Sequence, residues 1–332
     1  MEGCLKKSIL LIFLVISLYQ IAESETENKA LKIVDEFPTE SQMFKWNFAL
    51  NNGSRFVFNS SSIYFCDQDE NKIYEFDHKG NLIRIFGKKG QGPGDLNNPL
   101  NIAIFNNELY ITDNFNARIQ IWSLDGVYKR QIKIVSSFFN LIVVKGRIII
   151  SNPIGLTRAK EEKDKSNFEI YDMDGNLLKK VYDPFPGGKN IVLENDISVQ
   201  TLEDEFHCLQ NHGVEYRIYD SMGVRKKSIF LNYNPKNDRE YIRTKYQYTY
   251  MCFFNYEGRI YAPIAWYGNL VIVVFDREGR HLFNYVKTME DKNSIYSIAD
   301  IKIIKKEKSY FYLLLPNYKM FLINIRISQI FL

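Results

Sequence analysis

Cysteine is scarce in this chain of 332 residues, and its positions exclude a disulfide-stapled fold. Only Cys66, Cys208 and Cys252 follow the N-terminal apolar segment, and each lies in an apolar, strand-like context. An odd number of cysteines in such contexts argues against a disulfide framework. We therefore predict that all three are buried and act as small hydrophobic side chains.

Histidine is equally scarce, which limits the metal chemistry open to the chain. The sequence offers only His78, His207, His212 and His281, and their spacing provides no convergent set of ligands. No cofactor is expected, although a calcium or zinc ion in a central channel stays open as an alternative. The sequence also lacks the nucleophile elbow that would support a Ser/His/Asp triad.

Long apolar runs are absent except near the N-terminus. There, two lysines precede an apolar run at residues 8–21, and Ala22-Glu23-Ser24 follows it. The run is shorter than the roughly 20 residues needed to cross a bilayer. This pattern is typical of a signal peptide cleaved near Ser24. Because Cys4 precedes the run, lipid anchoring is not expected, and we predict a secreted or periplasmic protein without a membrane span in its mature part.

The excess of positive charge is small, with a formal net charge of +4. Such a balance does not favour a nucleic-acid partner. Aromatic residues, in contrast, are abundant, with 22 Tyr and 24 Phe giving an aromatic share of 15%. Aromatic side chains favour strands, so the composition predicts an all-β protein.

A repeated unit organises most of the chain. An alternating apolar strand followed by a polar turn ending in glycine recurs at residues 73–80, 119–126, 168–175, 216–223 and 273–279, with a degenerate sixth copy at 320–325. The glycines of the five clear copies are 46, 49, 48 and 56 residues apart. This period matches one four-stranded propeller blade. Asp in the turn is expected to bond the backbone ahead of it, and Gly to adopt positive φ.

The repeat predicts a single six-bladed β-propeller of four-stranded antiparallel blades over residues 25–332, after a signal peptide at residues 1–24. A ring of blades needs a closing strand, because closure removes exposed strand edges. The strand at about residues 31–37 is predicted to be the outer strand of the last blade. Residues 327–332 are the competing candidate.

One copy resembles a known repeat family. Residues 85–121 contain the run Gly90-Gln91-Gly92-Pro93-Gly94 and, after the next strand, Asp113-Asn114-Phe115-Asn116-Ala117-Arg118-Ile119, which resembles the NHL repeat. A weaker copy begins at Asp67, and the other blades keep only the strand and turn skeleton. The resemblance implies a propeller of a family that includes RNA-binding modules, protein-binding modules, extracellular sensor domains and a few lyases or hydrolases. It transfers no catalytic residue.

The lengths of the links predict where function resides. Links from the first to the second strand and from the third to the fourth are short. Links from the second to the third strand and from the fourth strand to the next blade are long and varied; we call their side of the ring the long-loop rim and the other the short-turn rim. Binding residues concentrate on long loops of rigid scaffolds. The candidate recognition residues on this rim are Arg118, His212, Trp266, Tyr267 and Tyr318.

Alternative roles for three of these residues stay open. Trp266 and Tyr267 could equally pack between blades, and for Arg118 a hydrogen bond that braces its turn is the favoured structural role. The function favoured by the sequence is that of an exported, monomeric, non-catalytic binding or scaffold protein. Its partner would be a protein, peptide or glycan. The alternative is a channel-centred, metal-assisted lyase or lactonase.

Overall fold

A computed structural model gives the structure of the protein. It describes residues 28–30, 33–37, 55–134, 140–151, 161, 165–185, 197–211, 213–232, 253–256, 258–264, 266–267, 269–288, 295–296, 300–305, 309–314 and 322–326. Strands dominate this part of the chain. One three-residue 3-10 turn, Asn114–Asn116, interrupts the described strands, and none of the described helical structure is long and apolar enough to cross a membrane.

The strands form successive antiparallel sheets of four neighbours in chain order, and these are the blades. The first blade contains β3 (Arg55–Phe58), β4 (Ser62–Asp67), β5 (Lys72–Asp77) and β6 (Leu82–Phe86). The second contains β7 (Pro99–Phe105), β8 (Glu108–Asp113), β9 (Arg118–Ser123) and β10 (Tyr128–Lys133). The third contains β11 (Asn140–Val144), β12 (Arg147–Ser151), β13 (Phe168–Tyr171) and β14 (Leu177–Val181).

The remaining three sheets continue the pattern, and one of them has a fifth strand. The fourth contains β15 (Ile197–Leu202), β16 (Glu205–Gln210), β17 (Glu215–Asp220) and β18 (Arg225–Phe230). The next sheet contains β19 (Phe254–Tyr256), β20 (Arg259–Ile264), β22 (Asn269–Phe275), β23 (His281–Thr288) and β1 (Asn28–Ala30). The last blade contains β25 (Asp300–Lys305), β26 (Ser309–Leu314), β27 (Leu322–Arg326) and β2 (Ile33–Phe37).

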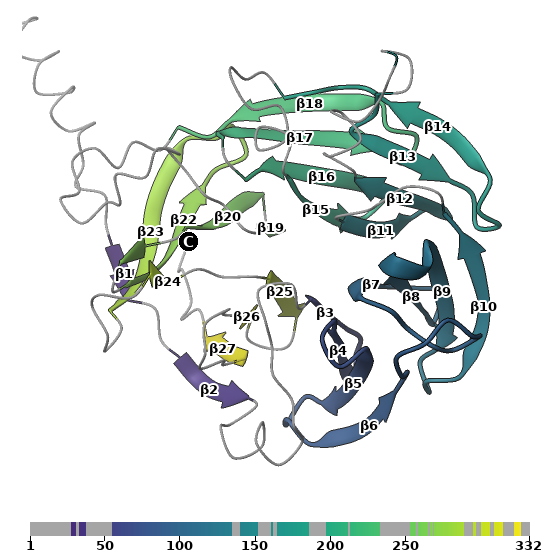
Figure 1. Ribbon diagram of the computed structural model, residues 1–332. Helices are drawn as coiled ribbons and strands as arrows, with labels where there is room; N and C mark the ends of the chain where they lie inside the picture. Colours follow the sequence, from purple (N-terminus) through teal and green to yellow (C-terminus); the bar gives the residue numbers. More distant parts are fainter. Residues whose placement is uncertain are drawn as a thin grey trace, which may run out of the picture.

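The sheets follow one another around a common centre, with β3, β7, β11 and β15 innermost and β6, β10, β14 and β18 outermost (Figure 1). The protein is therefore an all-β propeller with four-stranded antiparallel blades, as the repeat predicts. The repeated segment of the sequence forms the third strand of each sheet, because its alternating side chains fit the period of a strand.

The prediction of six four-stranded blades is wrong in its count, because among the described residues only five sheets have four strands. The sheet of β19, β20, β22 and β23 gains a fifth strand because β1 pairs in parallel with the outer strand β23. The next N-terminal strand, β2, pairs antiparallel with β27 and is the outer strand of its blade. The pairing of β1 covers the edge of β23, which would otherwise present unpaired backbone groups.

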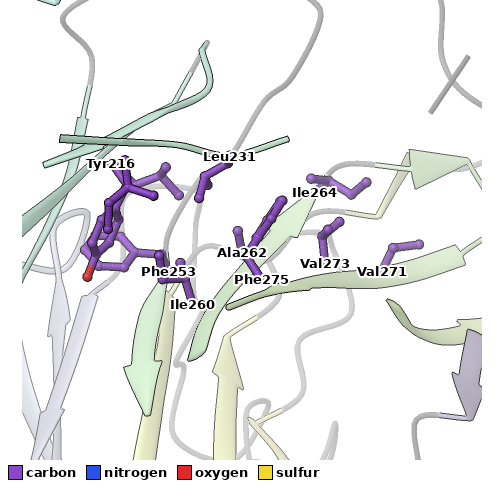
Figure 2. Close-up of a cluster of buried hydrophobic side chains, with 11 residues drawn as sticks. Tyr216, Leu231, Phe253, Ile260, Ala262, Ile264, Val271, Val273 and Phe275 are labelled. Carbon is purple, nitrogen blue, oxygen red and sulfur yellow. The ribbon is translucent and has the colours of Figure 1, made fainter. Parts of the chain in front are cut away.

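The hydrophobic core lies between neighbouring blades. One cluster joins Tyr64, Cys66 and Ile73 of the first blade to Ile111 and Trp122 of the second. Figure 2 shows the cluster between the fourth blade and the next sheet, where side chains from the two sides meet; it contains Tyr216, Leu231, Phe253, Ile260, Ala262, Ile264, Val271, Val273 and Phe275. Burial of these faces stabilises the packing of one blade on the next.

The predicted turn chemistry is confirmed. In the third blade, Asp172 Oδ1 accepts hydrogen bonds from the backbone N–H groups of Asp174, at 2.9 Å, and Asn176, at 2.8 Å. Gly175, in the same turn, has φ of 89°. Bonds from the side chain and backbone of Asn176 lower the pKa of Asp172. The same arrangement recurs at Asp77, Asp220 and Asp276, whereas Ser123 takes the aspartate's place in the second blade.

A repeated contact joins the outer strands of the first four blades to the next blade. The third residue of four outer strands is a cation that donates to a backbone carbonyl in the next blade's third-to-fourth-strand turn. The pairs are Arg84 with Asp125, Arg130 with Met173, Lys179 with Met222, and Lys227 with Arg277. The third residue of β23 is Phe283, so this contact stops at the strand that β1 covers.

Candidate functional site

The inner strands all begin on the long-loop rim. Neighbouring strands in a blade are antiparallel, so the first residue of an inner strand lies beside the end of the second strand. In the third blade this register pairs Asn140 with Ser151, and in the first blade it pairs Arg55 with Cys66. The starts of four distant segments therefore meet on one side of the ring.

A cavity of about 270 Å³ occupies the space between these inner strands. Its described lining comes from β3, β7, β11 and β15, together with Phe253. The end of the cavity on the long-loop rim, which we call the polar mouth, is lined by Arg55, Asn101, Asn140 and Ser198. Further in, the lining includes Val57, Ile102, Leu141, Ile142, Val143 and Val199, whose side chains pack in the hydrophobic clusters between blades, so the exposed lining is more polar than apolar.

Residues at the ends of the second strands hold the polar mouth in place. Asn140 Nδ2 donates to Ser151 Oγ at 2.9 Å and to the carbonyl of Ile197 at 2.8 Å. Ser198 Oγ donates to Asn211 Oδ1 at 2.7 Å. These bonds fix the side chains before any ligand arrives, which lowers the entropic cost of binding.

The charge of the described lining is simple. Among the described residues that line the cavity, Arg55 is the one cation and there is no carboxylate. The opposite end, towards the short-turn rim, carries the neutral polar residues Gln200 and Thr201. This arrangement can offer hydrogen bonds to a neutral or weakly anionic polar group.

Arg118 occupies the place that its structural interpretation predicts. Its side chain is buried, with Nε 2.6 Å from Asp113 Oδ2 and Nη1 2.7 Å from Gln131 Oε1. Nη2 donates to the carbonyls of Gly92, at 2.8 Å, and Asp95, at 2.9 Å. Arg118 thus ties the link between the first and second blades to β9, and no part of it lines the cavity. Contact with a ligand stays a prediction.

The other predicted recognition residues are placed in part. β21 (Trp266–Tyr267) pairs antiparallel with β24 (Ile295–Tyr296), so the link after β20 and the link after β23 meet as a two-stranded sheet. His212 and Tyr318 lie outside the described residues. A recognition surface formed by these residues stays a prediction.

Histidine and cysteine take structural places where the structure describes them. His207 is buried in β16, with Nδ1 bonded to the hydroxyl of Tyr216. Burial lowers the pKa of His207 to about 4, against a smaller opposite effect of Glu205. Cys66 and Cys208 are buried free thiols, and burial raises the pKa of both. Across the described residues, no group of three His, Cys, Asp or Glu side chains is arranged to hold a metal ion.

The residues of the polar mouth were not recognised in the sequence. Each is a common polar residue at or near the start of an inner strand, and inner strands carry no glycine turn that marks them. A usable signal does exist, because a polar residue opens a run of apolar residues in Asn101–Ile104 and Asn140–Val143. Aligning the inner strands by their blades would have brought the four positions together.

Fold and site together define an all-β propeller with a preformed polar opening to its central cavity. No family model matches the chain, and no curated protein matches it, so the NHL resemblance stays a prediction. Solved structures of bacterial propellers are similar in fold. A protein from Bacteroides fragilis whose name describes it as exported aligns with a TM-score of 0.60 at 10% identity, covering 90% of this chain and 95% of that one.

Two further structures align over most of their length. A member of the DUF4221 family from Bacteroides vulgatus gives a TM-score of 0.52 at 12% identity, over 83% of this chain and 94% of that chain. A catalytically inactive virginiamycin B lyase from Staphylococcus aureus, solved with quinupristin, gives 0.51 at 11% identity, over 82% and 80%. At these identities the likeness establishes the fold alone.

Proposed function

We propose that the protein is an exported, non-catalytic binding propeller that recognises a protein, peptide or glycan on its long-loop rim. The observation that supports this most directly is the polar mouth. Polar residues from four separate blades line one end of a cavity there, and hydrogen bonds to neighbouring strands hold the side chains of Asn140 and Ser198. Polar groups that converge on a concave opening are a usual feature of ligand sites.

Export is part of the proposal. It is supported by the basic and apolar N-terminal segment with its cleavage pattern near Ser24. The similar Bacteroides fragilis structure, named as an exported protein, agrees with this location. Fractionation of cells producing the full chain, with N-terminal sequencing of the exported product, tests the location directly. Retention of the uncleaved chain in the cytoplasm would contradict it.

Binding is tested with the purified exported protein, immobilised and exposed to a cell-envelope extract. Retained material is analysed both for protein and for carbohydrate. Arg55→Ala and the double variant Trp266→Ala/Tyr267→Ala alter the long-loop rim at two places. The matched control, Lys79→Ala/Asp174→Ala, changes two exposed residues on the short-turn rim.

We expect the wild type and the control variant to retain the same partner, and at least one long-loop-rim variant to lose most of it. Equal melting temperatures of all proteins establish that the loss is one of binding. An empty column with the wild type, or equal retention by every variant, contradicts the proposed function.

A further inference from the structure

The outer strands of three neighbouring blades carry a concentration of positive charge. β10, β14 and β18 contain no Asp or Glu and eight cations, which we call the basic band: Lys129, Arg130, Lys133, Lys179, Lys180, Arg225, Lys226 and Lys227. The chain as a whole has a formal net charge of +4, of which these strands supply +8, so the remainder carries −4. The positive charge is therefore gathered on one part of the surface.

Carboxylates offset only part of this charge. Three members of the basic band form ion pairs: Lys129 with Glu108, Arg225 with Asp183, and Lys226 with Glu205. Three others donate to backbone carbonyls, which carry no net charge: Arg130, Lys179 and Lys227. Lys133 and Lys180 are exposed towards the long-loop end of their strands, away from the aspartates of the glycine turns. Positive charge is thus in excess along all three strands.

Protection of strand edges does not explain where the basic band lies. Lysines on outer strands commonly prevent edge-to-edge pairing between molecules. β6 is also the outermost strand of its sheet, yet its one cation is Arg84, which is paired with Glu75. Ile83 and Ile85 of the same strand are exposed instead. Edge protection would require charge on β6 as well, so its concentration on β10, β14 and β18 indicates an anionic partner.

The shape of the ring favours a flexible, linear partner. β10, β14 and β18 follow one another along the outside of the ring and turn with its curve (Figure 1). A flat bilayer meets one or two of these strands at a time, whereas a flexible chain can follow the curve and contact all three. Surface groups of lysine and arginine bind linear polyanions, because binding releases the counterions of the chain.

An exposed aromatic ring beside the basic band suits a sugar. Tyr182 directly follows β14 and is 43% exposed. Lys165 Nζ lies 5.9 Å from the centre of its ring, and Lys180 is two residues before it. An aromatic ring offers a large apolar surface. It can contact the C–H groups of a sugar ring while a carboxylate or sulfate group on that sugar meets a neighbouring lysine.

We propose that the basic band binds an acidic polysaccharide, which lies along the outer strands of the second, third and fourth blades. The carboxylate or sulfate groups of the polysaccharide pair with the lysines and arginines of the band, and Tyr182 contacts a sugar ring. This surface is separate from the polar mouth. It takes from the proposed function only the location outside the cytoplasm, where a protein meets such polysaccharides.

The test is a calorimetric titration of the purified exported protein with polygalacturonate and with chondroitin sulfate. Neutral dextran, single-stranded DNA, poly-glutamate and phosphatidylglycerol vesicles are titrated in parallel. At least one acidic polysaccharide should bind, and its affinity should fall at least about tenfold between about 50 mM and about 200 mM salt. Dextran should not bind.

The variant Lys133→Gln/Lys180→Gln/Lys227→Gln removes one charge from each strand of the basic band. The matched control removes three exposed lysines of the first blade and the loop after it: Lys79→Gln/Lys88→Gln/Lys89→Gln. The band variant should bind the polysaccharide at least about tenfold more weakly and with a smaller salt dependence, and the control within about threefold of the wild type. Tyr182→Ala should weaken polysaccharide binding about threefold and leave poly-glutamate binding unchanged.

Equal melting temperatures establish that the loss is one of binding. If the triple variant melts lower, Lys133→Gln/Lys180→Gln carries the test, because both side chains are exposed. Absence of binding by both polysaccharides, or equal losses in the band variant and the control, overturns the inference. Tighter binding of DNA, poly-glutamate or vesicles than of either polysaccharide overturns it as well.

The proposed function is judged separately by the envelope extract. Arg55→Ala and Trp266→Ala/Tyr267→Ala should bind the polysaccharide as the wild type does, because they alter the long-loop rim. If the protein retains its extract partner through that rim but binds neither polysaccharide, the proposed function stands and the basic band is not a binding surface.

Discussion

The second and fourth blades use a buried arginine for the same purpose but place it differently. In the second blade, Arg118 is the first residue of β9, and its carboxylate partner Asp113 ends β8. In the fourth blade, Arg217 is the third residue of β17, and its partner Glu215 begins the same strand, with oxygens 2.8 and 3.0 Å from the guanidinium. The arginine has moved by two positions, so it stays on the same face of the strand.

Both arginines donate hydrogen bonds to the link that connects their blade to the preceding one. Arg118 donates to carbonyls of the link between the first and second blades, and Arg217 Nη1 donates to the carbonyl of Asp183 at 2.7 Å in the link between the third and fourth. Glu215 stands at the strand position that Arg118 has in the second blade. Arg217 stands where the second blade has Gln120, so the acid and the arginine occupy different positions in the two blades while the structural task persists.

The strongest test of this equivalence removes each arginine. Arg118→Ala leaves Asp113 as a buried carboxylate without its cation, and Arg217→Ala does the same to Glu215. Each change should lower the free energy of unfolding by about 3–5 kcal/mol, as expected when one partner of a buried pair is lost. Urea denaturation measures the loss. Arg217→Ala should be at least as damaging, since Arg217 also stacks 3.8 Å from the Phe185 ring centre.

A second substitution that restores part of the lost stability provides the control. Asp113→Asn in the Arg118→Ala background removes the uncompensated charge and should restore part of the stability. Lys226→Ala removes the exposed pair with Glu205 and should change the urea midpoint little. If the arginine variants behave like Lys226→Ala, the two blades are not anchored by these residues.

A titratable group distinguishes the two blades. His207 is the third residue of β16, where β8 has Tyr110. Burial holds the pKa of His207 at about 4 in the folded state, against 6.5 in the unfolded chain. Its neutral form is therefore required for full stability, which is present above pH 6.5. As the pH falls from 6.5 to 4 the unfolded state alone gains the proton, and stability drops by up to about 3 kcal/mol.

The measurement is the free energy of unfolding of wild type and His207→Gln across pH 4 to 7. Subtracting the two curves removes the contribution of the carboxylates common to both. The difference should shrink as the pH falls, because only the wild type loses stability through this group. A difference that stays constant with pH would place the titration elsewhere.

The second and fourth blades share a turn glycine that packs against the outer strand of the preceding blade. A Cβ at Gly223 would lie 2.5 Å from Val181 Cγ2, and one at Gly126 would lie 2.8 Å from Phe86 Cδ1, in each case on the preceding outer strand. Both glycines have positive φ. Substitution by Ala should cost about 2 kcal/mol from backbone strain and the close contact together. Thermal melting of both variants should show losses of similar size.

Gly146→Ala separates the two causes. Gly146 also has positive φ, but its nearest neighbour would be 4.0 Å from a Cβ, so only the backbone strain of about 1 kcal/mol remains. The double variant Gly223→Ala/Val181→Ala should recover part of the contact cost relative to Val181→Ala alone. Equal losses at Gly146 and Gly223 would mean that contact with the preceding blade contributes nothing.

The sequence predicts most of the strands because their signals are local. An alternating strand such as Ile73–Phe76 and a turn such as Asp172–Gly175 depend on neighbouring residues, and both form as predicted. The prediction of six four-stranded blades fails at β23, where β1 joins from more than 250 residues away. No local pattern at Asn28–Ala30 indicates a parallel strand, since its partner is set by where the chain's start lies once the blades have packed.

The site was predicted less well than the fold. The choice of rim follows from link length, and the polar mouth lies on that rim. Of the five predicted recognition residues, Arg118 is buried in bonds to its own blade and to the link before it, and Trp266 and Tyr267 form a paired strand on that side. The sequence does not mark Arg55, Asn101, Asn140 and Ser198, because a single polar residue near a strand start indicates no site until its neighbours in space are known.

The amino-acid sequence by itself determined the repeat, the strand order within each blade and the turns, because side-chain alternation and Asp-Gly turn geometry act over a few residues. The tertiary structure alone decided which segments share an edge and which side chains share a cavity. Packing of blades brings together residues such as Arg55 and Ser198, more than 140 positions apart. That proximity depends on the curvature of the whole ring, which no short stretch of sequence contains.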